Sequence, residues 1–176
     1  MWAYTIGFTV LPHVGGFFGW FINRKEIPVW YEKLKKPSWC PPRRIFPVAW
    51  TVLYTGMGYA SYLIWNDLGG CSSKAIVPLG LYGAQLALNW AWPLFFFGAR
   101  NLKMALIDIL CLDGLVIGTM CSWYRINKIA TLLMVPYLGW LAMATCLTIR
   151  IWKDNPEHFF YKSRTEMKAF CETKLC

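Results

Sequence analysis

Five long apolar segments constrain the fold of this chain more than any other feature of its sequence. They cover about residues 4–22, 45–65, 78–97, 104–123 and 129–152. Each has close to the roughly 20 residues that an α-helix needs to cross a hydrocarbon core about 30 Å thick. Because most of the connections between them are short, neighbouring helices must run antiparallel. The sequence predicts an all-α fold, a five-transmembrane-helix bundle with a long first loop over residues 23–44.

The composition supports a membrane location for these segments. Of the 176 residues, 57% are hydrophobic and only 15% are charged. A soluble domain of this size buries roughly 70% of the surface of its unfolded chain, so much of the remaining apolar surface would face water. The first segment is expected to be a retained span and not a secretory signal, because its basic residues, Arg24 and Lys25, follow it.

The distribution of Lys and Arg predicts the orientation of the bundle. The formal net charge is +9, and most basic residues lie in the first loop, the third loop and the C-terminal tail. The positive-inside rule therefore places the first loop and the C-terminus in the cytosol. Topology and attraction to anionic membrane lipids account for the basic excess. We therefore expect no nucleic-acid partner.

The sequence contains no pattern that is typical of a catalytic or metal site. The seven Cys residues lack the spacing of a zinc site or a disulfide framework and are expected to be free thiols or small apolar residues. Asp108 and Asp113 lie roughly 140° apart around a helix, so they do not form a carboxylate pair. We expect no enzyme activity, no cofactor and no metal, although a proton-relay role for Asp113 stays open.

Small residues recur at four-residue spacing, which lets helix backbones approach closely. The three motifs are Gly15-x-x-x-Gly19, Gly83-x-x-x-Ala87 and Gly114-x-x-x-Gly118. We expect these motifs to pack helices within one chain, and a homodimer is the alternative.

Three of the predicted spans each carry aromatic and small or polar residues on one helical face. These faces are Trp50, Tyr54, Met57 and Ser61; Tyr82, Gln85, Asn89 and Trp92; and Tyr137, Trp140, Ala144 and Leu147. Such faces suit a pocket for a flat, mostly apolar ligand that Asn89 or an indole N–H would orient. Ordinary helix packing produces the same periodicity and is the alternative interpretation.

Four longer motifs then carry a family resemblance. They are Trp30-Tyr31-x-x-Leu34-x-Lys36-Pro37-Ser38-Trp39-x-Pro41-Pro42, Trp50-x-x-Leu53-Tyr54-x-x-Met57-Gly58-Tyr59, Ala87-Leu88-Asn89-Trp90-Ala91-Trp92-Pro93 and Pro136-Tyr137-Leu138-x-Trp140-Leu141-Ala142. In this order the chain resembles the translocator protein family, also called peripheral-type benzodiazepine receptor or tryptophan-rich sensory protein. The resemblance implies a transmembrane domain over residues 1–155 and a cytosolic C-terminal tail over residues 156–176.

The resemblance also implies a function. Family members hold cholesterol, porphyrins such as protoporphyrin, and synthetic ligands in a pocket capped by the first loop, and the chain would then mediate cholesterol transport or redistribution. The implied ligand-binding residues are Trp50, Asn89, Trp92, Trp140, Ala144 and Leu147. A membrane scaffold or receptor subunit, and a protein for porphyrin transport or breakdown, are the alternatives. The loop residues Trp39, Pro41 and Pro42 suit either a lid or an anchor at the membrane surface.

The sequence departs from the family pattern at two places. The cholesterol motif of the fifth span has Ile149 where a tyrosine belongs, which leaves Ile149, Arg150 and Lys153 as candidates for sterol contact. Trp20 and Met104 stand at the drug site, so we expect benzodiazepine-type drugs to fit poorly.

Two short motifs bear on the organelle. Leu11-Pro12-His13 and Ile126-Asn127-Lys128 resemble the second, erythroid vertebrate form, which resides in the endoplasmic reticulum and plasma membrane. Trp50 and Asn89 agree with the archetype, which resides in the mitochondrial outer membrane.

Overall fold

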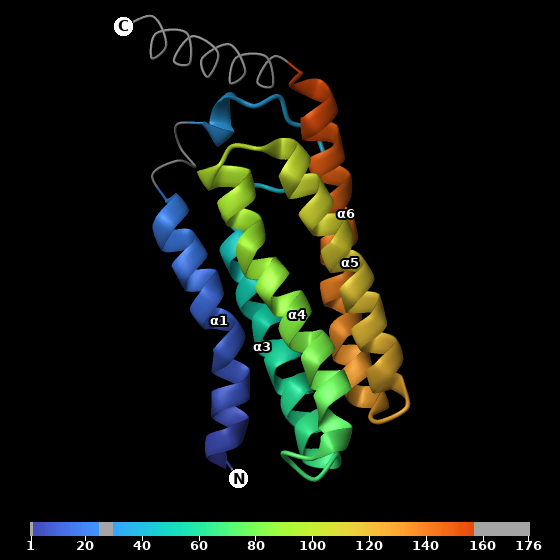
Figure 1. Ribbon diagram of the computed structural model, residues 1–176. Coiled ribbons are helices and arrows are strands. Elements are labelled where there is room, and N and C mark those ends of the chain that lie inside the picture. Colours follow the sequence, from blue (N-terminus) through green and yellow to red (C-terminus); the bar gives the residue numbers. More distant parts are fainter. Residues whose placement is uncertain (1, 25–29, 157–176) are drawn as a thin grey trace, which may run out of the picture.

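Long helices make up most of the chain. The computed structural model describes residues 2–24 and 30–156. Within these ranges there are five long helices and no strand: α1 (Trp2–Asn23), α3 (Ile45–Asp67), α4 (Ile76–Pro93), α5 (Leu102–Tyr124) and α6 (Lys128–Asp154). They run side by side along one direction, as Figure 1 shows. The all-α prediction is confirmed, whereas the predicted tail lies, apart from Pro156, outside the described residues.

The helices form a ring that does not follow the order of the chain. α3 packs mainly on α1 and α6, α5 packs on α4 and α6, and α1 closes the ring against α4. Two short 3₁₀ turns (Tyr31–Lys33 and Ser73–Ala75) and a π-helical segment (Leu94–Gly98) join them. Asn101 and Asn127 begin α5 and α6, since each side chain accepts a hydrogen bond from a backbone N–H of the first turn.

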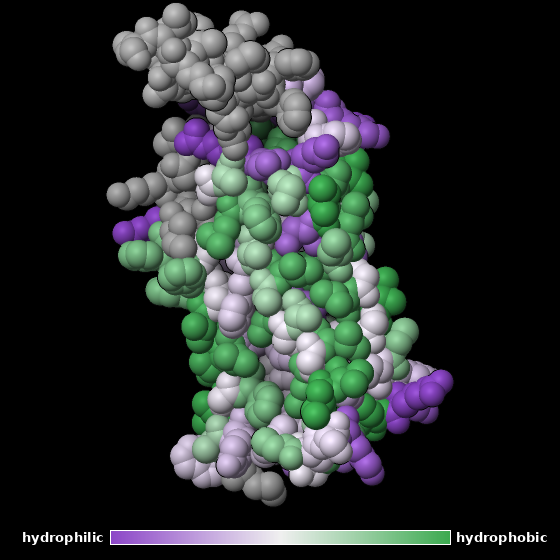
Figure 2. Space-filling model, in the orientation of Figure 1, coloured by the Kyte–Doolittle hydropathy of each residue, from purple (hydrophilic) through white to green (hydrophobic). Residues whose placement is uncertain are grey.

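The outer surface of the bundle is apolar. In the described part of the chain, α5 and α6 are long and apolar enough to cross a membrane, whereas α1, α3 and α4 do not meet the same criterion of length and hydropathy. Many large apolar side chains are exposed, among them Trp2, Phe17, Val48 and Leu132. Figure 2 shows apolar residues over the middle of the molecule and hydrophilic ones toward both ends. Length and composition thus support two of the five predicted spans, and the other three stay a prediction.

The glycine motifs have different environments. A Cβ added at Gly15 would lie 2.0 Å from the ring of Trp90, and one added at Gly58 would lie 2.6 Å from a backbone oxygen of α1. These glycines bring α1 against α4 and α3. Gly83, Gly114 and Gly118 have no such neighbour within 4 Å among the described residues, so the prediction of close packing within the chain is wrong for them. Gly83 and Gly114 are exposed, which means that they face away from the bundle interior.

Candidate functional site

The three predicted faces meet where α3, α4 and α6 approach one another. The ring centroid of Trp50 lies 5.1 Å from that of Tyr54 and 6.4 Å from those of Tyr137 and Trp140. Asn89 on α4 completes this group, which we call the Asn89 cluster: Trp50, Tyr54, Asn89, Tyr137 and Trp140. The structure therefore brings Trp50, Asn89 and Trp140 together, and ligand binding by them stays a prediction.

Asn89 is engaged by two tyrosines from the neighbouring helices. The Tyr54 hydroxyl donates to Asn89 Oδ1 at 2.7 Å, and Asn89 Nδ2 donates to the Tyr137 hydroxyl at 3.0 Å. That hydroxyl in turn donates to Gln85 Oε1 at 2.9 Å. Asn89 is only 4% exposed, and a buried polar group of this kind is costly without partners. In this structure Asn89 therefore joins α4 to α3 and α6 by hydrogen bonds. The sequence did not predict these two hydrogen bonds.

Two indole N–H groups at the predicted site have no partner. Trp92 Nε1 and Trp140 Nε1 are buried, and neither has a hydrogen-bond acceptor among the described residues. Two tryptophans elsewhere differ: Trp90 Nε1 donates to the Pro12 carbonyl at 3.3 Å, and Trp123 Nε1 donates to the Pro78 carbonyl at 3.1 Å. An indole nitrogen is a donor only, so Trp92 and Trp140 present two buried donors to any acceptor atom beside them.

Trp92 and Leu147 belong to a second group, which includes the first loop. The Trp92 ring stacks on Phe96 with centroids 4.7 Å apart, and Leu147, 6% exposed, lies in the same apolar cluster. We call this group the loop cluster: Trp30, Tyr31, Leu34, Phe96, Leu102, Ala105, Leu147 and Ile151, with Trp92 packed against it. Phe46 links the two groups, because it packs on the loop cluster and its ring lies 5.7 Å from Trp140.

The first loop covers the bundle through its first described residues and not through its proline-rich end. Trp30, Tyr31 and Leu34 are buried, whereas Trp39 is 48% exposed. Burial raises the pKa of the Tyr31 hydroxyl, and a hydrogen bond with Cys40 acts in the same direction. The part of the loop that covers the bundle is therefore residues 30–34. Trp39 lies at the surface, which agrees better with an anchor than with a lid.

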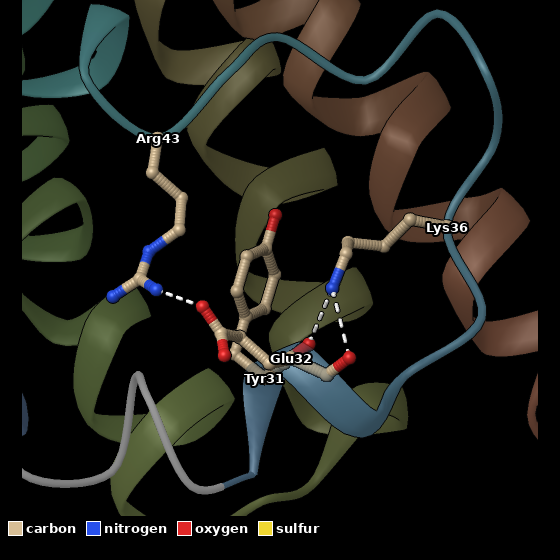
Figure 3. Close-up of polar contacts among 4 residues, drawn as sticks. All are labelled: Tyr31, Glu32, Lys36 and Arg43. Carbon is tan, nitrogen blue, oxygen red and sulfur yellow. Dashed lines mark hydrogen bonds and ion pairs between the residues drawn. The ribbon is translucent and has the colours of Figure 1, made fainter.

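Contacts within the loop fix its shape. The Lys36 ammonium donates to the Tyr31 carbonyl at 2.7 Å and lies 4.4 Å from the centre of the Tyr31 ring. Arg43 pairs with Glu32 on the other side of that ring, as Figure 3 shows. Tyr31, Lys36 and Arg43 line part of a recess of about 500 Å³ on this loop.

The remaining predicted residues are only partly buried or are exposed. Ala144 and Ile149 are partly buried on α6, whereas Arg150 and Lys153 are exposed. A sterol that met Arg150 would therefore lie on the outside of the bundle. Trp20 and Met104, expected at the drug site, are both exposed. Asp113 Oδ2 accepts a hydrogen bond from Thr145 at 2.8 Å, which ties α5 to α6.

Comparison with known proteins agrees with the resemblance in the sequence. The TspO/MBR family matches residues 8–153. Translocator protein from Bos taurus is 50% identical over 154 residues, which cover 88% of this chain and 91% of that protein. Translocator protein 2 from Canis lupus familiaris is 43% identical, covering 86% and 90%. Tryptophan-rich protein TspO from Archaeoglobus fulgidus is 37% identical, covering 80% and 89%.

These names bear on two of the expectations. The relatives are named as translocator proteins and not as enzymes, which agrees with the prediction that the chain is not an enzyme. Identity to the bovine Translocator protein exceeds identity to the canine Translocator protein 2, so similarity to the second form in particular stays a prediction. With a family match over most of its length and exposed apolar helices, the chain is a membrane protein and belongs to the TspO/MBR family.

Proposed function

We propose that this protein binds a flat, mostly apolar ligand of the sterol or porphyrin class between α3, α4 and α6, beneath the first loop. By holding and releasing such a ligand it redistributes cholesterol between intracellular membranes. The observation that carries the proposal is the pair of buried indole donors on Trp92 and Trp140, which have no acceptor in the described part of the chain. An unpaired buried donor costs about 1–3 kcal/mol, and a ligand oxygen would recover that cost.

The surroundings of these donors favour this ligand class. The rings of Trp50 and Trp140 are nearly perpendicular, at 81°, and Phe46 and Trp92 add further apolar surface nearby. Aromatic walls with a few oriented polar groups are typical of pockets for rigid apolar ligands. A sterol offers one hydroxyl oxygen and protoporphyrin offers carboxylate oxygens, so either can accept from an indole N–H.

The membrane arrangement is part of the proposal. All five long helices would cross the bilayer, which their exposed apolar side chains support. The excess of Lys and Arg in the first loop and tail supports a cytosolic location for both. The host membrane is the endoplasmic reticulum, with the plasma membrane, if the chain acts as the second form, and the mitochondrial outer membrane if it acts as the archetype.

Conservative changes at the two indoles test the pocket. Trp92→Phe and Trp140→Phe keep a ring and remove the N–H. In detergent, each should weaken protoporphyrin or cholesterol binding by about five- to tenfold, the equivalent of one lost hydrogen bond. The ligand-free protein loses no hydrogen bond and is relieved of an unpaired donor, so its thermal stability should not fall. Trp123→Phe is the matched control, because that indole already donates to the Pro78 carbonyl; it should lower stability and leave affinity intact. Unchanged affinity in both site variants would refute the pocket.

A scaffold or receptor subunit, working as a homodimer, is the second candidate function. One observation favours it: a Cβ added at Gly114 or Gly118 meets nothing within 4 Å among the described residues, so a second helix could approach this face closely. Replacing Gly114 with Leu should then abolish self-association in a crosslinking assay, whereas Trp140→Phe should not. Self-association that survives Gly114→Leu would reject this candidate.

A further inference from the structure

The end of α6 is joined to the first loop by one side chain. Asn155 Oδ1 accepts from the backbone N–H of Lys35 at 2.9 Å, and Asn155 Nδ2 donates to the carbonyl of the same residue at 3.0 Å. The same Nδ2 also donates to the Ile151 carbonyl at 2.8 Å. Asn155 is 8% exposed, so these three hydrogen bonds are formed largely away from water.

The chemistry of this contact is specific to an amide. The side-chain amide of Asn155 both accepts from and donates to the backbone of Lys35, as a residue does when it pairs with its neighbour in an antiparallel β-sheet. Its second N–H satisfies a carbonyl of the last turn of α6, where a helix leaves backbone acceptors unpaired. Aspartate would keep only the acceptor, and leucine would keep the approximate shape without any of the three bonds. We call this contact the Asn155 latch.

The latch lies where the loop covers the candidate site. Leu34, beside Lys35, is 3% exposed and belongs to the loop cluster together with Leu147 and Ile151 of α6. In the same cluster the Tyr31 ring contacts Phe96, on which Trp92 stacks. The loop therefore shares an apolar cluster with Leu147 of the predicted pocket and reaches Trp92 through Phe96, and the latch holds it there.

The other polar contacts of the loop act differently. The bonds from Lys36 to the Tyr31 carbonyl and the pair between Arg43 and Glu32 join loop residues to one another, as Figure 3 shows. They keep the loop in one shape whether or not it rests on the helices. The Asn155 bonds instead join the loop to a helix across 120 residues of sequence. Breaking them should free a loop that keeps its own shape.

We infer that Asn155 is a positioning residue that sets how fast a ligand enters and leaves beneath the first loop. The inference rests on the proposed function. Because the latch holds the loop over the empty and the occupied site alike, its loss raises the fraction of time that the loop is open in both states. Association and dissociation then accelerate together, and the equilibrium affinity stays nearly constant.

Hydrogen exchange and binding kinetics on the full chain in detergent test this inference. Asn155→Leu removes all three bonds and should speed exchange of the Lys35 amide about tenfold or more, since each net hydrogen bond is worth about a factor of five to ten. Stopped-flow quenching of tryptophan fluorescence by protoporphyrin should show both rate constants rising about fivefold or more, with Kd within about twofold. Asn155→Asp, which keeps the acceptor, should give smaller changes in the same direction.

Asn127→Leu is the matched control. Asn127 caps the opposite end of α6 by accepting from the Ala130 N–H at 2.9 Å, so its loss should lower stability without changing exchange at Lys35 or the binding rates. Unchanged exchange and rates in Asn155→Leu would overturn the inference, and so would equal effects from Asn127→Leu. If the native chain bound no protoporphyrin or cholesterol while Lys35 exchange still responded, the proposed function would fail and the contact between loop and helix would stand.

Discussion

The hydrogen bonds of Asn89 predict a measurable coupling between α3 and α4. Tyr54→Phe leaves Asn89 Oδ1 without its donor, and Asn89→Leu leaves the Tyr54 hydroxyl without its acceptor. Each single change should cost about 1–3 kcal/mol, because each leaves a buried polar group unpaired. The double variant removes both partners of that bond and leaves neither of them unpaired, so its cost should be smaller than the sum of the single costs.

The expected coupling follows from comparable measurements in membranes. Interhelical hydrogen bonds there average about 0.6 kcal/mol and reach about 1.7 kcal/mol in double-mutant cycles. The Tyr54 bond is short and buried, so we expect about 1 kcal/mol. Reversible unfolding in mixed micelles, followed by far-UV circular dichroism, gives the four free energies of unfolding. Tyr59→Phe is the control, because Tyr59 lies on the exposed side of α3. Additivity within about 0.3 kcal/mol would show that the bond does not join the helices.

Three further changes test the packing and the loop. Gly58→Ala places a Cβ 2.6 Å from a backbone oxygen of α1, so it should lower the unfolding free energy by about 1–3 kcal/mol in the same assay. Gly114→Ala meets no neighbour and should raise that free energy by up to about 1 kcal/mol through helix propensity; a loss would show that this face is packed. Arg43→Gln removes a half-exposed pair with Glu32 and should change the melting midpoint little, since such pairs contribute about 0–1 kcal/mol.

The helices could be predicted because the segments that form them are long and apolar. The segments predicted over 45–65, 104–123 and 129–152 correspond to α3, α5 and α6 within about two residues at each end. The third segment differs, because regular α-helix ends at Pro93 and a π-helical segment continues it to Gly98. Hydrophobicity cannot reveal the change from α-helix to π-helix, because the segment Leu-Phe-Phe-Phe is as apolar as the helix before it. Proline explains it, because it lacks the N–H that the ladder needs.

The site could be predicted only in part. The periodic faces put Trp50, Asn89 and Trp140 toward one centre, and the structure places them there. Periodicity gives the direction of a side chain but not its hydrogen-bond partner, so the tyrosines that engage Asn89 were not foreseen. Asn155 was not foreseen at all. An asparagine just after the end of a helix is typical of an ordinary helix cap, so the sequence gives no sign of a distant partner. That partner, Lys35, is 120 residues away.

The order of the helices around the ring has a consequence for biosynthesis. The chain leaves the ribosome with α1 and α3 first, and α3 makes few contacts with α4, which follows it. The side of α3 that packs on α6 meets its partner only after α6, the last helix, has been made. A nascent chain that stops after α5 therefore leaves that side of α3 uncovered. Quality-control factors that recognise unfinished membrane proteins would bind this uncovered side of α3 before α6 is made.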